Sequence, residues 1–383
     1  MIPYGKQDVW ADDIEVVIDV LKSDFLTQGP TVPKFEDALS GITRAKYVTA
    51  VNSATSALHI ACLALDLRPD DIVWTVPNTF VASANCALYC GAKIDFVDID
   101  PQTSNLSVTL LKQKLSSAKK TGKLPKIVIP VHLSGEPCDM FAIKKLSDEY
   151  GFKIIEDASH AIGGQYHGEP IGSCRHSDIT VFSFHPVKII TSGEGGAALT
   201  NCPDLDRRLK LFRSHGITRD QELMQNRTDD EWYYEQIDLG FNYRMTDIHA
   251  ALGLSQLTRL SRYVERRHEI ACRYDNEFAN TNVTTPYRNP ENKSALHLYV
   301  IQVEPSQHKL VFHTLRSKNI GVNLHYIPVH TQPYYKNLGF SWGDFPNSEA
   351  YYKRSISLPI FPNLSEDEQN YVIHSVKTIC DNA

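Results

Sequence analysis

The sequence lacks an excess of positive charge: 45 acidic residues outnumber 39 Lys and Arg, and the formal net charge is −6. It also lacks an apolar run long enough to span a membrane, a GxGxxG motif after the first predicted strand and a charged-then-apolar start. These absences argue against a nucleic-acid or membrane partner and against a Rossmann oxidoreductase. We expect a cytoplasmic protein.

The eight cysteines include no CxxC pair. Cys86 and Cys90 lie four residues apart in a helical pattern, a spacing at which two thiols can in principle share a metal ion. No second pair of ligands completes such a site. We therefore predict no metal and interpret the cysteines as packing residues of a protein in a reducing compartment.

Short β-branched apolar runs alternate with segments of helical periodicity through the first 200 residues. This alternation is typical of βαβ units and predicts an α/β fold with a mainly parallel, seven-stranded sheet. We expect its strands at residues 45–51, 72–76, 93–97, 126–131, 153–156, 178–184 and 195–200. We expect the helices between them at residues 54–65, 79–90, 107–118 and 138–150.

The rest of the chain predicts a second, smaller domain. Residues 247–279 have helical periodicity without a proline, and residues 281–294 are rich in turn residues, which marks a boundary. Beyond it, HLYVIQV, a helix around 306–318, VNLHYI and a last helix from Ser365 indicate an α+β lobe. The predicted domains are therefore a large one with an N-terminal arm, a linking helix and a small one, at 1–246, 247–280 and 281–383.

The segment TVFSFHPVKIITSGEGGAAL, residues 180–199, places a lone lysine, Lys188, between an aromatic-rich strand and a glycine-dense turn. A surface lysine needs no such setting. Desolvation lowers the pKa of a lysine and makes it a nucleophile, which forms Schiff bases with carbonyls such as pyridoxal phosphate. That cofactor also needs a carboxylate at its ring nitrogen, a phosphate cup and a flat side chain against its ring.

Asp157, in IIEDASHA, is the candidate carboxylate. It directly follows the predicted strand at 153–156, and open α/β sheets bind ligands at the carboxyl ends of their strands. The same position suits a helix-capping aspartate equally well.

The stretch NSATS, residues 52–56, is the candidate phosphate cup, because it precedes a predicted helix whose first N–H groups attract anions. Thr55 and Ser56 can add hydroxyl donors, and Ser183 can add another from the strand leading to Lys188. A plain helix cap remains an alternative for this stretch. Phe80 is the candidate stacking ring, with a core phenylalanine as its alternative.

With these positions in hand, four segments resemble the hallmark segments of the DegT/DnrJ/EryC1/StrS sugar aminotransferases: NSATSALH, EDASHA, SFHPVKIITSGEGG and LGFNYRMTDIHAALGLSQL. The resemblance covers nearly the whole chain. It implies a fold-type I pyridoxal phosphate enzyme that acts on nucleotide-linked keto sugars.

The resemblance also implies roles for individual residues. Lys188 would form the Schiff base, Asp157 would pair with the ring nitrogen and His160 would lie near the ring hydroxyl. The residues implied to hold the phosphate or cover the ring are Ala54, Thr55, Ser183, Phe80 and Asn242. Asn242 would act from the neighbouring subunit, which makes a homodimer with shared active sites the expected assembly. The implied substrate-side residues are Tyr4, His185, Glu194, His325 and Tyr326.

Within the family, IPYGKQ, DFLTQGP, SFHPVK, LFRSHGI and VHTQPYY most resemble members that transfer the amino group of glutamate to C4 of a UDP-linked 4-keto-6-deoxy-N-acetyl-hexosamine. A 3-amino or dTDP-sugar transaminase is the nearest alternative. A family dehydratase is disfavoured, because such members carry histidine in place of Lys188. A regulatory protein that binds the cofactor without turnover is disfavoured by the complete set of cofactor residues and by the lack of a basic DNA-binding patch.

Overall fold

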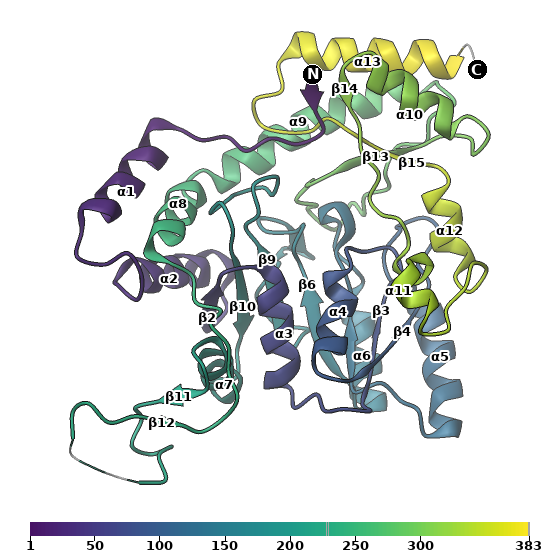
Figure 1. The fold of residues 1–383 in the computed structure, drawn as a ribbon. Coiled ribbons are helices and arrows are strands. Elements are labelled where there is room, and N and C mark those ends of the chain that lie inside the picture. Colours follow the sequence, from purple (N-terminus) through teal and green to yellow (C-terminus); the bar gives the residue numbers. More distant parts are fainter. Residues whose placement is uncertain (227, 229, 382–383) are drawn as a thin grey trace.

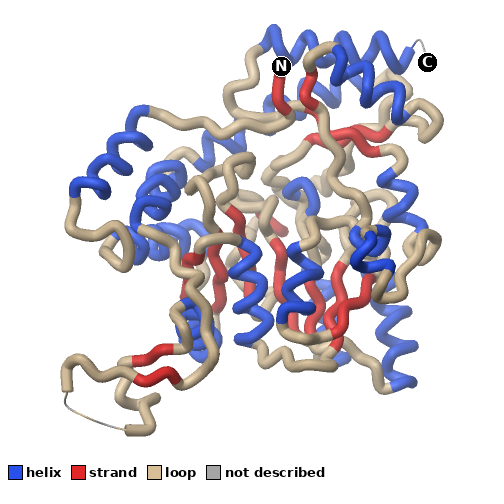
Figure 2. The backbone as a smooth tube through the Cα atoms, in the orientation of Figure 1, coloured by secondary structure: helices blue, strands red, loops and turns tan. Residues whose placement is uncertain are grey.

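The computed structural model describes residues 1–226, 228 and 230–381 (Figure 1). Its centre is one seven-stranded sheet (Figure 2). The strands of this sheet, in chain order, are β2 (Tyr47–Val51), β3 (Ile72–Thr75), β4 (Lys93–Phe96), β5 (Ile127–Ile129), β6 (Lys153–Asp157), β9 (Ile179–Ser183) and β10 (Gly196–Thr200). All seven predicted strands are confirmed.

The strand order across the sheet is β2-β10-β9-β6-β5-β3-β4. Neighbours from β9 to β4 pair in parallel, whereas β10 pairs antiparallel with both β9 and β2. The predicted mainly parallel α/β sheet is therefore confirmed. Because the parallel strands share one direction, their carboxyl ends meet at one edge of the sheet, toward the C-terminal part of the chain in Figure 1.

Helices cover both faces of this sheet, which is why its strands read as continuous apolar runs. One face packs against α3 (Ala54–Ala64), α4 (Ala82–Tyr89) and α7 (Pro203–Arg213). The other packs against α2 (Thr31–Thr43), α5 (Val108–Thr121), α6 (Met140–Tyr150) and α8 (Asp247–Leu257). Successive strand residues alternate between the two faces, as Ile127 and Val128 show.

A third apolar cluster belongs to the C-terminal part and contains buried side chains from Ile270 to Cys380. The elements of the C-terminal part of the chain are α9 (Leu260–Phe278), β13 (Tyr299–Gln302), α10 (His308–Ser317), β14 (Ile320–Gly321), α11 (Pro333–Lys336), α12 (Pro346–Tyr352), β15 (Ser355–Leu358) and α13 (Glu366–Asp381), with 3-10 turn η2 at Val329–Thr331. The helical pattern predicted over 247–279 is divided in the structure, since α8 ends at Leu257 and α9 begins at Leu260. VNLHYI forms no regular strand.

The remaining elements are short or terminal: β1 (Ile2–Pro3), α1 (Ala11–Lys22), η1 (Leu133–Gly135), β7 (Gln165–Tyr166), β8 (Glu169–Pro170), β11 (Ile217–Thr218) and β12 (Glu235–Gln236). β1 pairs with β14, so the first residues of the chain lie on its C-terminal part, where Figure 1 also places both termini. The domain division stays a prediction. No helix within the described residues is both long and apolar enough to cross a membrane.

Candidate active site

Lys188 lies in the turn that joins β9 to β10. The turn closes through Phe184, whose N–H donates to the Gly195 carbonyl at 2.9 Å, and the Lys188 N–H donates to the His185 carbonyl at 2.9 Å. The Lys188 side chain is half-buried. Desolvation lowers its pKa to about 8, although the negative charge of Asp157 opposes this change. A fraction of the amine is therefore neutral near pH 7.

Asp157 is the last residue of β6 and is 4 % exposed. Its Oδ2 accepts a 2.6 Å hydrogen bond from Ser83 Oγ, and its Oδ1 accepts from the Ser159 N–H at 3.1 Å. No helix begins at this position, so the helix-capping alternative is wrong. Instead, the carboxylate is a buried anion whose charge acts on Lys188, which places the two predicted residues in one site.

The start of α3 is the predicted phosphate cradle, and its first backbone N–H groups are available to an anion. Ser53 caps the helix by accepting from the Ser56 N–H at 3.1 Å, and the helix begins at Ala54. The N–H groups of Ala54 and Thr55 belong to the first turn, where no intrahelical acceptor is available. The cap and the anion cradle are therefore compatible.

Gly196 allows this helix start to approach the sheet. It pairs with Val51 of β2 on one side and with Ser183 of β9 on the other, so Ser183 lies one strand away from the cradle. A Cβ atom at position 196 would lie 2.5 Å from the Ala54 nitrogen. Only glycine fits there without displacing the helix.

His160 is buried and bonded through both ring nitrogens. The Ser134 N–H lies 3.3 Å from Nδ1, and the Tyr326 hydroxyl lies 3.0 Å from Nε2. Because Nδ1 accepts, Nε2 carries the proton and donates to Tyr326. Burial, with the nearby positive charge of Lys188, keeps the pKa of His160 well below its ordinary value, so the ring is neutral at pH 7.

Two further histidines surround Lys188. The His325 ring lies 5.1 Å from the Tyr4 ring, its Nδ1 lies 2.8 Å from Ser357 Oγ, and burial followed by the Lys188 charge lowers its pKa to about 3. The His297 ring lies 4.4 Å from His160, and the same two causes keep its pKa well below the ordinary value. All three imidazoles are therefore uncharged near neutral pH.

Phe80 is 57 % exposed, so the alternative of a core phenylalanine is wrong. Its ring lies 6.2 Å from that of Tyr326. The backbone N–H of Tyr326 donates to Asn78 Oδ1 at 3.2 Å, which ties this segment to the loop that carries Phe80. Phe80 and Tyr326 thus stand together at the rim of the site.

Three of the predicted site residues, His185, Glu194 and Asn242, are exposed and lie outside the buried group around Lys188 and Asp157. His185 and Glu194 are exposed on the turn that carries Lys188. Asn242 is also exposed, and the adjacent Tyr243 carbonyl accepts from the Asn52 N–H at 2.9 Å. The roles of these residues stay predictions.

Sequence reasoning missed four groups in the site: the Ser83 hydroxyl, the Asn78 amide, the Ser134 N–H and the His297 ring. Within the described residues, Asn78 Nδ2 and His297 Nδ1 are buried without a hydrogen-bond partner. Ser83 and His297 carried a weak signal at most, since each lies in a segment assigned from periodicity alone.

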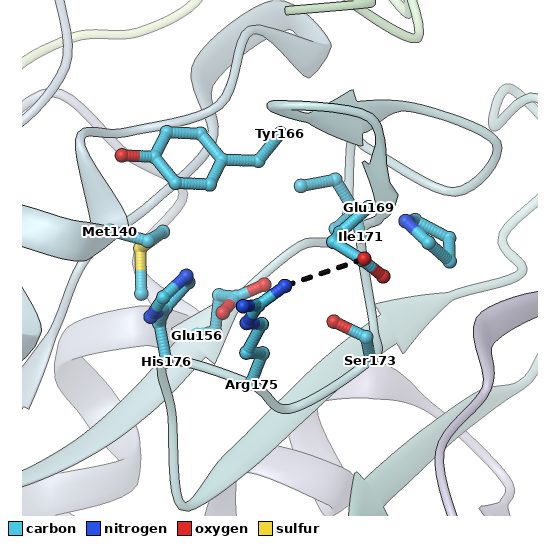
Figure 3. A pocket seen from close by; sticks show the side chains of 9 residues that line it. Met140, Glu156, Tyr166, Glu169, Ile171, Ser173, Arg175 and His176 are labelled. Atoms are coloured by element: carbon cyan, nitrogen blue, oxygen red, sulfur yellow. Dashed lines mark hydrogen bonds and ion pairs between the residues drawn. The ribbon is translucent and has the colours of Figure 1, made fainter.

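Glu156, next to Asp157, points to the other side of β6. It lines a small cavity of about 20 Å³, and Figure 3 shows it next to Arg175 and His176, with Tyr166 on the far side of the cavity. Glu156 Oε1 lies 3.2 Å from His132 Nε2. Burial lowers the pKa of His132, but Cys138 and the Glu156 carboxylate outweigh that effect and raise this pKa to about 10. The cavity holds a water at most, so the cofactor chemistry belongs to the Asp157 side.

The residues around Lys188 fit pyridoxal phosphate. Lys188 provides an amine of lowered pKa, and Asp157 provides a buried carboxylate. Gly196 lets the start of α3 lie close to the sheet, and the polar atoms Asn78 Nδ2 and His297 Nδ1 are buried without a protein partner. Among the described residues, no group of three or more His, Cys, Asp or Glu could hold a metal ion.

Comparison with known proteins decides the family. The profile of the DegT/DnrJ/EryC1/StrS aminotransferase family matches residues 7–377. The chain belongs to this family. Its members use pyridoxal phosphate, and its fold is that of the fold-type I enzymes.

Three relatives show how far the similarity extends. SpsC, a spore coat polysaccharide biosynthesis protein of Bacillus subtilis, is 37% identical over 100% of this chain and 98% of its own. The UDP-4-amino-4,6-dideoxy-N-acetyl-beta-L-altrosamine transaminase of Campylobacter jejuni is 36% identical over 100% of this chain and 98% of its own. The solved structure of a protein assigned as a sugar aminotransferase in Streptococcus pneumoniae, in its pyridoxal phosphate form, has a TM-score of 0.89 at 30% identity. The match covers 100% of this chain and 99% of that one.

Proposed function

We propose that this aminotransferase moves the amino group of L-glutamate to C4 of a UDP-linked 4-keto-6-deoxy-N-acetyl-hexosamine. The product would be UDP-4-amino-4,6-dideoxy-N-acetyl-beta-L-altrosamine, a precursor of pseudaminic acid for cell-surface polysaccharide or flagellin glycosylation. The observation that carries the proposal is the juxtaposition of Lys188 with the buried Asp157 in a family of sugar aminotransferases. The similarity to the Campylobacter enzyme supports the choice of substrate.

The site residues would share the work of holding the cofactor. Asp157, fixed by Ser83, would face the ring nitrogen, and the helix start at Ala54 and Thr55 with Ser183 would hold the phosphate. Pyridoxal phosphate, when bound, supplies an electron sink that stabilises negative charge at the substrate carbon. Phe80 would cover the ring and exclude water from one side.

Lys188 would move the proton. Its lowered pKa leaves a usable fraction of neutral Nζ, which takes a proton from the α-carbon of glutamate and later returns one to C4 of the sugar. His160 would stay neutral and hold Tyr326 through Nε2, so that no second cation competes with Lys188. Two half-reactions in one site predict ping-pong kinetics.

A homodimer with shared active sites is part of the proposal. Asn242 is exposed beside the helix start of its own chain and would reach the phosphate of a neighbour. The arm around β11 and β12 leaves the body of the molecule in Figure 1, and it carries Trp232 and Leu239, which are 75 % and 74 % exposed. Large apolar side chains in such a position favour contact with another chain.

The nearest alternative is a 3- or 4-aminotransferase for another UDP- or dTDP-sugar. SpsC, whose 37% identity matches the 36% of the Campylobacter enzyme, is named for spore coat polysaccharide biosynthesis. The deciding experiment offers the holoenzyme glutamate with UDP- and dTDP-linked 3-keto and 4-keto sugars and locates the new amine by NMR. We expect an amine at C4 of the UDP-linked 4-keto sugar; exclusive product at C3 or from dTDP-sugars would contradict the proposal.

A further inference from the structure

A cavity of about 440 Å³ lies between α4 and α11. Its lining comes from one face of α4 and from the segment at the start of α11. The lining residues are Val81, Asn85, Leu88, Tyr89, Gln332, Pro333, Tyr334 and Tyr335. None of them was predicted as a site residue.

Both walls of this cavity begin at the rim of the candidate active site. Phe80 directly precedes Val81 on one wall, and Tyr326 leads through η2 to the other. Two hydrogen bonds join the walls where they leave the site: the Val329 N–H donates to the Pro77 carbonyl at 2.8 Å, and the Tyr326 N–H donates to Asn78 Oδ1 at 3.2 Å. The cavity therefore lies next to the loop that carries Phe80 and to the segment that carries Tyr326.

Two exposed aromatic rings border the cavity, with Tyr89 54 % and Tyr334 61 % exposed. Tyr334 packs edge to face against Tyr335 at 5.7 Å. Tyr335 is 2 % exposed, and its hydroxyl donates to Asn85 Oδ1 at 2.6 Å, which crosses from one wall to the other. The exposed ring of Tyr334 thus rests on the buried Tyr335, which Asn85 holds in place.

The side chains that line the cavity suit an uncharged, flat ligand group with hydrogen-bonding atoms along its edge. Every side chain in the lining is uncharged, which disfavours a diphosphate as the occupant. Aromatic faces stack on nucleobases, and the amides of Asn85 and Gln332 can pair with the donors and acceptors of a base edge. A small apolar cavity with a few polar groups at its rim is the usual form of a ligand subsite.

We propose that this cavity binds the pyrimidine base of the sugar nucleotide, while the sugar lies toward Phe80 and Lys188. The inference rests on the proposed function, since it assigns the part of the substrate that does not react. Tyr334 would stack on the base, and Asn85 and Gln332 would read its edge.

The test uses the holoenzyme with UDP-N-acetylglucosamine, a stable UDP-sugar without a keto group. Calorimetry measures its affinity, and saturation-transfer NMR compares contact at the uracil protons with contact at the N-acetyl methyl group. The variants are Tyr334→Ala and Gln332→Ala. The matched control is Tyr287→Ala, which removes a tyrosine, 38 % exposed, from a different cavity.

Tyr334→Ala should weaken binding about 5- to 150-fold, the usual loss for one stacked base, and the uracil signal should fall relative to the methyl signal. Gln332→Ala should cause a smaller loss, and Tyr287→Ala should bind as the wild type does. An unchanged uracil signal in Tyr334→Ala would overturn the inference, as would a loss of dimer without a loss of uracil contact, which would make the cavity a subunit interface. A wild type that binds no UDP-sugar at all would instead contradict the proposed function.

Discussion

At the scale of single residues, the account depends on how the surroundings lower the pKa of Lys188 and hold the carboxylate of Asp157 in place. Burial destabilises the ammonium form of Lys188, and Asp157 opposes that effect. Asp157 in turn is held by Ser83 and by the Ser159 N–H. The two groups therefore form one electrostatic unit whose parts can be changed separately.

The free amine of Lys188 should titrate well below an ordinary lysine. Competitive labelling of the cofactor-free protein with acetic anhydride at pH 6–11, read by mass spectrometry, should give a midpoint near pH 8 instead of 10.5. Asp157→Asn should move the midpoint lower, because Asp157 raises the pKa of Lys188. A midpoint that stays near 10.5, or rises in Asp157→Asn, would contradict this electrostatic unit.

Ser83→Ala should impair catalysis by freeing the Asp157 carboxylate. A hydrogen bond to a charged group contributes about 1.5–3 kcal/mol, so kcat should fall about 10- to 150-fold in both half-reactions. Ser147→Ala is the matched control, since Ser147 is also buried and its Oγ donates to the Phe152 carbonyl at 2.6 Å, just before the start of β6 and so at the end of that strand opposite to Asp157. Equal kinetic losses in the two variants would show that Ser83 acts only through stability.

At the scale of elements, the site depends on the close approach of α3 and β10. Gly196 is the residue that permits it. The alternation of strands and helices brings α3 next to β10. The absence of a Cβ atom at Gly196 then allows the start of α3 to lie this close to the strand.

Gly196→Ala should displace the first turn of α3 and weaken the binding of pyridoxal phosphate. Loss of one bond to the phosphate, at about 1.5–3 kcal/mol, corresponds to about 10- to 150-fold in Kd, measured by absorbance titration of the apoprotein. Gly41→Ala is the control, because a Cβ at position 41 of α2 meets no neighbouring atom within 4 Å. Unchanged cofactor affinity in Gly196→Ala would mean that the helix start is not the phosphate cradle.

The sequence predicts the sheet well because strands buried on both faces must be apolar along their whole length. The division between α8 and α9 has no such local signal. Arg259, at the break, pairs with Asp13 and lies over the Trp10 ring at 4.9 Å, contacts made by residues more than 240 positions away. Long-range contacts of this kind override helical periodicity.

The candidate site divides in the same way. Lys188 and Asp157 could be predicted, because each follows a recognisable buried strand. Ser83 could not, because its hydroxyl becomes important only when β6 and α4 are brought together. His297 begins a strand-like run, and only the fold places its ring 4.4 Å from His160.

At the scale of the whole molecule, the proposal requires two chains for each complete site. Asn242→Ala homodimers should lose cofactor retention and Lys188→Ala homodimers should lose turnover. Mixing the two and allowing exchange should restore about a quarter of wild-type activity, because half of the dimers are mixed and each mixed dimer has one intact site. No recovery in a confirmed mixed dimer would show that Asn242 serves its own chain.

The most direct test of the central claim is reduction of the holoenzyme with borohydride, followed by peptide mapping. The account predicts that the cofactor becomes fixed to the peptide carrying Lys188, and that Lys188→Ala gives no fixed cofactor. Fixation at a different lysine, or unchanged fixation in Lys188→Ala, would contradict the claim that this amine and the Asp157 carboxylate form one cofactor site.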